Sequence, residues 1–190
     1  MAEETSRYEI HSSNGSTLAL EVFKKGLLAG KRHVLYFGKF FGELEYDPQQ
    51  PERSELRFVI ESHSVTCEDK WLTSRQRKRV VSFALDKMLV ADRYPEIKFS
   101  STVIITQAVN HYDLQGNLTI RGTTRPVLIH LATKLGVASM EVTGKAIVRM
   151  KDYGMKPPPD LLGLSGTKGK MKLRFLMWAE RVTAGVRAGG

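Results

Sequence analysis

Few side chains in this sequence have a spacing that suits covalent or acid–base chemistry. The histidines His11, His33, His63, His111 and His130 occur singly, with no His-x-x-x-His pair and no cysteine or acidic cluster at metal-ligand spacing. We expect His63 and His130 to point outward from strands and the other three to occupy turns. The sequence therefore predicts no metal site.

The single cysteine is an equally weak candidate for a nucleophile. Cys67 is followed by Glu68 and Asp69, acids that raise the pKa of a neighbouring thiol, and one cysteine permits no internal disulfide. There is also no Gly-x-Ser-x-Gly elbow. We expect Cys67 to be a small, partly buried structural thiol, and we predict no catalytic residue, no cofactor and no enzymatic activity.

Basic residues are the one chemically distinctive group. The formal net charge is +9 and the pI is about 9.7, which suits attraction to an anionic partner. The aromatic residues Phe58, Phe99 and Phe175 alternate away from the charged side, unlike the stacking rings of nucleic-acid modules. A surface module that binds nucleic acid or an anionic membrane remains the alternative function, and its best contact residues are Arg75, Arg77, Lys78, Arg79 and Lys168.

Strands dominate the pattern from which these residues project. Between Lys168 and Met177, basic and apolar residues alternate with the period of two that is typical of a strand with one wet face and one dry face. Similar patterns, separated by Gly, Pro, Asn and Asp, predict about eight strands in a meander. Besides 168–177, they cover 18–22, 34–44, 56–60, 97–107, 112–120, 127–131 and 140–150.

One segment, from about residue 74 to residue 90, has the pattern of a helix instead. Its apolar residues Val80, Val81, Ala84, Leu85 and Met88 form an amphipathic stripe. One helix among many strands favours an all-β fold, an extended eight-stranded antiparallel barrel with a helical insertion. We expect a single domain over residues 1–190, with an ordered core at about 7–182 and loose termini.

Two blocks of sequence resemble the YceI-like family of lipocalin-like polyisoprenoid-binding proteins. The stretch YPEIKFSS, from Tyr94 to Ser101, is similar to that family's tyrosine-proline-x-isoleucine-x-phenylalanine-x-serine signature. The stretch GNLTIRGTTRPV, from Gly116 to Val127, is similar to a second family block, with Arg125 in place of a lysine. Weaker agreement extends the resemblance over about residues 8–179.

The sequence also departs from the family pattern. Tyr8 and His11 stand where the family commonly has tryptophan and aspartate, and Lys24 and Lys25 lie where it has a histidine. Met150 replaces an arginine. The resemblance implies a lipocalin-like barrel whose apolar tunnel binds, stores or transports a long isoprenoid, such as a prenyl diphosphate or a quinone tail.

The apolar residues that alternate along the predicted strands are candidates for the inner face of the barrel. Small barrels are often filled by side chains, so these residues form either a tunnel wall or a packed core. A polar head group would sit at a barrel mouth, near Arg75, Arg77, Lys78, Arg79 or Lys168. The inner-face candidates are Leu18, Leu20, Val22, Phe58, Ile60, Phe99, Val103, Ile105, Leu118, Ile120, Val127, Ile129, Leu131, Leu173, Phe175 and Met177.

The first residues of the chain indicate the cellular compartment in which we expect the protein. Glu3 and Glu4 stand where a secretory signal would have a basic segment, and no apolar run reaches the roughly 18 residues of a membrane-spanning helix. We expect a cytoplasmic protein. The sequence leaves the oligomeric state open, a homodimer included.

Overall fold

The structure, a computed structural model, describes residues 5–25, 30–156 and 167–182. Nearly all regular structure in these ranges belongs to one antiparallel sheet of 11 strands. The strands are β1 (Ser6–His11), β2 (Thr17–Lys24), β3 (Arg32–Phe37), β4 (Phe40–Tyr46), β5 (Glu55–Glu61), β6 (Val65–Cys67), β7 (Glu96–Ala108), β8 (His111–Ile120), β9 (Thr123–Leu135), β10 (Ser139–Arg149) and β11 (Thr167–Arg181).

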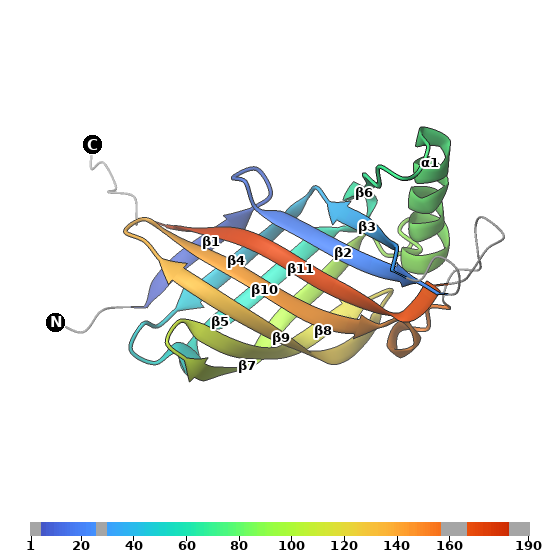
Figure 1. Cartoon of the computed structure of the whole chain (residues 1–190). Coiled ribbons are helices and arrows are strands. Elements are labelled where there is room, and N and C mark those ends of the chain that lie inside the picture. Colours follow the sequence, from blue (N-terminus) through green and yellow to red (C-terminus); the bar gives the residue numbers. More distant parts are fainter. Residues whose placement is uncertain (1–4, 26–29, 157–166, 183–190) are drawn as a thin grey trace, which may run out of the picture.

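The sheet closes on itself as a barrel (Figure 1). Its wall has eight antiparallel lines, where a line is either one long strand or two consecutive strands that lie end to end. Three of these lines consist of two consecutive strands each: β1 with β2, β3 with β4, and β5 with β6. The first line closes the barrel, because β1 pairs with the end of β11 at Ile10 and Ala179, and β2 pairs with its earlier part at Leu20 and Leu173. The predicted eight-stranded antiparallel barrel is thus confirmed.

Alternation along the strands explains why the sheet can close around an apolar interior. In β8, Leu114, Gly116, Leu118 and Ile120 are buried, whereas the residues between them are exposed or half-buried. A strand with this period has one face for the core and one for water, and a closed barrel leaves no unpaired edge where it is complete.

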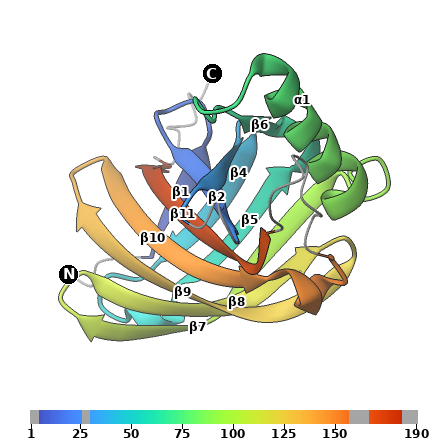
Figure 2. The same ribbon diagram turned by 45° about the vertical axis from the view of Figure 1, so that its right-hand side comes forward.

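The helical insertion lies between β6 and β7. The helix α1 (Ser74–Phe83) begins with a capping box, in which the Thr73 hydroxyl accepts from the Gln76 backbone N–H and the Gln76 side chain accepts from the Thr73 backbone N–H. It continues as a π-helical segment, η4 (Ala84–Leu89), which ends at Val90 in the left-handed region. The predicted helix over about 74–90 is therefore present. Val80, Ala84, Met88 and Leu89 of these two segments belong to the hydrophobic core. Figure 2 shows the helix at one end of the barrel.

A buried acid ties the loop before this helix to the barrel. One Asp69 carboxylate oxygen lies 2.8 Å from His33 Nδ1, and the other accepts from the Val34 backbone N–H at 3.0 Å. His33 in turn stacks on Trp71, with ring centroids 5.1 Å apart. Asp69 and His33 are both buried, so these hydrogen bonds fix the approach to α1 against β3.

Short 3-10 turns complete the described structure: η2 (Pro51–Arg53), η3 (Ser62–Ser64) and η5 (Met150–Tyr153). We call the end that carries α1, η4 and η5 the helix end. The other end, with the start of β1 and the finish of β11, is the terminal end (Figure 1). Within the described part of the chain, no helix combines the length and apolar character needed to cross a lipid bilayer.

Several details differ from the sequence-based expectations. The strand predicted over 34–44 is divided at Gly38 and Lys39 into β3 and β4, and β1 and β6 were not predicted. The loose ends expected at residues 1–6 and beyond 182 lie largely outside the described residues. His33 and His11 do not occupy turns, because His33 lies within β3 with its side chain buried and His11 is the last residue of β1. His63 lies in the turn η3 and not on a strand.

We expect Asp69→Ala to destabilise the protein by about 2–4 kcal/mol, because it leaves a buried ring N–H of His33 and a half-buried backbone N–H of Val34 without their acceptor. Denaturant unfolding followed by circular dichroism measures this loss. Asp92→Ala is the control, since Asp92 is exposed and contacts only exposed His63. Equal stability of the two variants would show that Asp69 does not anchor the helix.

Candidate functional site

Within the described residues, three apolar cavities lie inside the barrel. Cavity I, at the helix end, has a volume of about 110 Å³. Residues of α1 and η4 cover it, and strand residues form the rest of its wall. Its lining includes Leu20, Val22, Leu35, Ile60, Val80, Phe83, Met88, Leu118, Ile120, Val148, Met150 and Leu173.

Cavities II and III continue toward the terminal end, with volumes of about 90 and 70 Å³. Cavities I and II share the wall residues Ile60, Leu118 and Leu173. Cavities II and III likewise share part of their wall, so the three spaces follow one another through the barrel. The residues shared by cavities II and III are Ile10, Leu56, Leu114, Leu131 and Val142.

The length of this row of cavities can be calculated from the number of residues of β10 that run beside it. Met140 lines cavity III, and Met150, just beyond the strand, lines cavity I. Ten residue steps at about 3.4 Å, reduced by the usual tilt of barrel strands, give roughly 25 Å along the axis. This is close to the roughly 30 Å thickness of the hydrocarbon core of a bilayer.

The walls are apolar enough to disfavour water. Each cavity is larger than the roughly 10–15 Å³ that one water molecule requires, but a buried water also needs two to four polar partners. Lys24 and His33 are the ionisable residues among the described lining of cavity I, cavity II has none, and cavity III has only the hydroxyls of Tyr46 and Tyr112. The interior therefore suits hydrocarbon better than water or a charged group.

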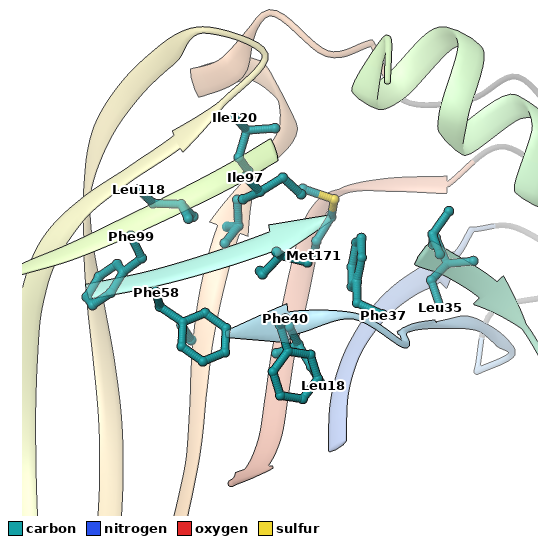
Figure 3. Close-up of a cluster of buried hydrophobic side chains, with 14 of the residues drawn as sticks. Leu18, Leu35, Phe37, Phe40, Phe58, Ile97, Phe99, Leu118, Ile120 and Met171 are labelled. Atoms are coloured by element: carbon teal, nitrogen blue, oxygen red, sulfur yellow. The ribbon is translucent and has the colours of Figure 1, made fainter. Parts of the chain in front are cut away.

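Three phenylalanine rings and three glycines keep cavity II open. Phe58, Phe99 and Phe175 line the cavity, and each ring lies against a glycine on the neighbouring strand. A Cβ at Gly144 would come within 2.3 Å of the Phe175 ring, and one at Gly116 within 2.3 Å of the Phe99 ring. Because no side chain stands there, the rings can lie on the wall and do not project into the lumen. Figure 3 shows Phe58 and Phe99 beside Leu118 and Ile97 in this interior.

Most of the apolar residues proposed for the inner face do line cavity I or cavity II. The prediction of an inner-face position is wrong for Val103 and Ile105, because these residues are exposed, with exposed fractions of 45% and 39%. The pairing of β7 with β8 shifts between Ser101 and Val103, where an extra residue forms a β-bulge and reverses the alternation. Ile104 takes the inward position and lines cavity III. The remaining candidates lie along the cavities: Leu18, Leu20, Val22, Phe58, Ile60, Phe99, Leu118, Ile120, Val127, Ile129, Leu131, Leu173, Phe175 and Met177.

Sequence reasoning missed the polar residues of the wall. Lys24 and His33 continue the inward positions of β2 and β3, so the alternation places them inside although their charge suggests the surface. In cavity III, burial and a hydrogen bond with Tyr112 raise the pKa of Tyr46 to about 12. The hydroxyl of Tyr46 therefore stays neutral at physiological pH.

The proposed head-group residues all lie at the helix end, but none of them is among the described lining of cavities I, II and III. Arg75, Lys78 and Arg79 are exposed on the outer side of α1. Arg77 is half-buried and donates to the Asp69 carbonyl oxygen at 3.5 Å and to the Ser74 hydroxyl at 3.2 Å. Lys168 is exposed near the start of β11. Among the described residues, no group of three or more His, Cys, Asp or Glu is arranged to hold a metal ion.

Comparison with known proteins agrees with this architecture. The model of the YceI-like domain family matches residues 10–177. A UPF0312 protein of Pseudomonas putida (strain W619) is 27% identical over 129 residues, which is 64% of this chain. The match spans 63% of the length of that relative.

Solved structures show the same fold at low sequence identity. BcnA of Burkholderia cenocepacia has a TM-score of 0.71 and 18% identity, with coverage of 86% of this chain and 95% of BcnA. A polyisoprenoid-binding domain from Saccharophagus degradans has a TM-score of 0.67 and 14% identity, with coverage of 94% of this chain and all of that domain.

We expect the Cys67 thiol to react slowly. Burial, followed by the nearby Asp69 charge, raises the pKa of Cys67 to about 11, so only about one molecule in a thousand carries the thiolate at pH 8. Alkylation by iodoacetamide at pH 8, followed by mass spectrometry, should be at least about 100-fold slower in folded than in urea-unfolded protein.

The same pKa shift gives a pH dependence of stability. The unfolded thiol ionises near its ordinary pKa of about 8.5, whereas the folded thiol keeps its proton up to about pH 11. The stability contribution of the protonated thiol is thus complete below about pH 8.5 and declines as the pH rises toward 11.

Equal alkylation rates in folded and unfolded protein would contradict the burial of Cys67.

Proposed function

Because this chain belongs to the YceI-like domain family, we propose that it binds, stores or transports one long isoprenoid lipid chain in its barrel, without changing it chemically. The observation that carries this proposal is the row of three apolar cavities with shared walls. A linear hydrocarbon chain matches both the shape and the polarity of that row. Support also comes from the Saccharophagus degradans neighbour, whose name describes a polyisoprenoid-binding domain.

A filled core is the competing explanation, and the cavities argue against it. Protein interiors are close-packed, and they contain few voids larger than a water molecule. Three such voids in one line, each bordering the next, differ from scattered packing defects. The Phe58, Phe99 and Phe175 rings that lie on the wall also leave the lumen free, whereas rings in a filled core would occupy it.

The energetics favour a long chain over a short one. Each buried methylene gains about 0.8 kcal/mol, so a five-carbon isoprene unit gains about 4 kcal/mol before ordering costs. Those costs include about 4–15 kcal/mol of lost translational and rotational freedom. A single unit therefore binds weakly, whereas a chain that spans all three cavities binds firmly.

The apolar wall residues and the basic residues of α1 have different roles in this proposal. The apolar wall, from Met150 at the helix end to Met140 at the terminal end, holds the chain. A charged head group would lose its hydration in such a wall, so it stays outside, where Arg75, Lys78 and Arg79 are nearby. This function requires no catalytic residue and no cofactor besides the lipid.

We expect Gly144→Ala to lower the affinity for a long prenyl chain by about tenfold or more. The new Cβ pushes the Phe175 ring into cavity II, and loss of room for two methylenes alone accounts for about 1.6 kcal/mol. Displacement of a fluorescent farnesyl analogue by unlabelled chains of increasing length measures the change.

Gly38→Ala is the matched control. A Cβ at Gly38 meets only the Ser64 carbonyl oxygen at an ordinary 3.6 Å, and Gly38 lines none of the three cavities. This variant should bind like the parent protein. If Gly144→Ala folds and binds every chain length as the parent does, or if the parent binds no prenyl chain, the proposal fails.

A further inference from the structure

Charge is distributed unevenly along the barrel axis. At the helix end, exposed cations lie on α1, on η4 and on the adjoining ends of β10 and β11. At the terminal end, exposed or half-buried acids are numerous, among them Glu43, Glu45, Asp47, Glu52 and Glu180. We call the cations Arg75, Lys78, Arg79, Lys87, Arg149 and Lys170 the basic end surface.

The cations of the basic end surface also differ in their pairing from other exposed cations. Near the helix end, Lys98 pairs with Glu96 at 2.8 Å and Lys39 with Glu61 at 3.4 Å. At the terminal end, Arg7 pairs with Glu43, and Lys134 pairs with Glu141 at 3.0 Å. Within residues 5–25, 30–156 and 167–182, no ion pair joins any member of the basic end surface to an acid. Of the exposed acids nearby, Glu68 lies on the loop before α1, Asp86 accepts from Ser82, and Asp92 contacts His63.

This arrangement works against local stability. The first turn of α1 holds Arg75 and no acid, although the positive end of the helix dipole favours acids there. Lys78 and Arg79 follow in the next turn, and α1 contains no acid to pair with them. Arg149 and Lys170 face each other directly across β10 and β11, where like charges repel. Folding alone therefore does not explain why cations gather here, whereas an anionic partner does.

We propose that the basic end surface docks the protein on an anionic lipid bilayer, with the helix end of the barrel against the membrane. The inner side of α1 and η4 covers cavity I, so docking brings the row of cavities within about one helix diameter, roughly 10 Å, of the lipid. The purpose of docking rests on the proposed function, since a bilayer supplies or receives an isoprenoid chain.

A bilayer fits this surface better than a nucleic acid does. Single-stranded nucleic acids are held by basic grooves with exposed aromatic rings that stack on the bases. The large exposed aromatic residues in the described ranges are Tyr36 and Phe41, which lie on β3 and β4 and not on α1. A convex helix that presents only charged and small polar side chains outward suits a flat, anionic surface.

Sedimentation of the whole protein with vesicles tests the inference. One set of vesicles is phosphatidylcholine, and the other is an equal mixture of phosphatidylcholine and phosphatidylglycerol. We expect binding to the mixed vesicles only, with a loss at roughly 1 M salt, where the screening length is about 3 Å. The variant R75E/K78E/R79E should bind roughly a hundredfold more weakly or worse.

Two matched variants separate docking from other effects. R53E/R57E/K145E makes the same change in net charge at exposed positions away from the helix end, and it should keep most of the vesicle binding. Gly144→Ala should bind vesicles like the parent, because docking needs no cargo, so failure of the proposed function would leave this result unchanged. Acids at the start of α1 favour the helix, so R75E/K78E/R79E should fold, as near-ultraviolet circular dichroism verifies.

The inference is overturned if the two triple variants lose vesicle binding equally, because net charge alone would then be responsible. It is also overturned if the parent protein ignores anionic vesicles. Tighter, salt-dependent binding to single-stranded or double-stranded DNA than to the mixed vesicles, reduced by R75E/K78E/R79E, would assign the surface to nucleic acid.

Discussion

The position of three phenylalanine rings determines whether the interior space of the barrel is continuous from one end to the other. Eight strands enclose a lumen that side chains can fill, and aromatic rings are the largest apolar groups available to fill it. In this protein Phe58, Phe99 and Phe175 lie against Gly42, Gly116 and Gly144, so their bulk is placed on the wall. The space that remains joins the cavities at the two ends of the barrel.

The helix end completes this arrangement. The sheet is interrupted between β6 and β7, and α1 with η4 covers cavity I in place of a strand. Asp69 and His33 hold the entry to α1 on β3, and the capping box of Thr73 and Gln76 fixes where the helix starts. One element therefore supplies an apolar lid to the interior and a basic outer surface, which connects the proposed cargo with the proposed membrane contact.

Much of the fold could be predicted from the sequence, because alternation and helical periodicity are local signals. They identified the wall positions Leu18, Phe99 and Leu118 and the helix after Thr73. They could not reveal the bulge after Ser101, since an extra residue in one strand is visible only against its partner, and Val103 and Ile105 were therefore placed on the wrong face.

The candidate site was harder to predict for a different reason. Lys24 and His33 are charged or polar residues at inward positions, where alternation and residue type give opposite indications. Asp69, the partner of His33, comes from a loop distant in sequence. The open lumen itself depends on cross-strand contacts between glycines and phenylalanines, so it becomes visible only once the strand register is known.

The most direct test of this account is a crystal structure of the protein purified without any step that removes lipid. If the barrel carries a lipid chain, continuous, elongated electron density runs through cavities I, II and III, with the Phe58, Phe99 and Phe175 rings against the wall. An interior in which these rings have turned inward and closed the lumen, with no such density, would contradict the account.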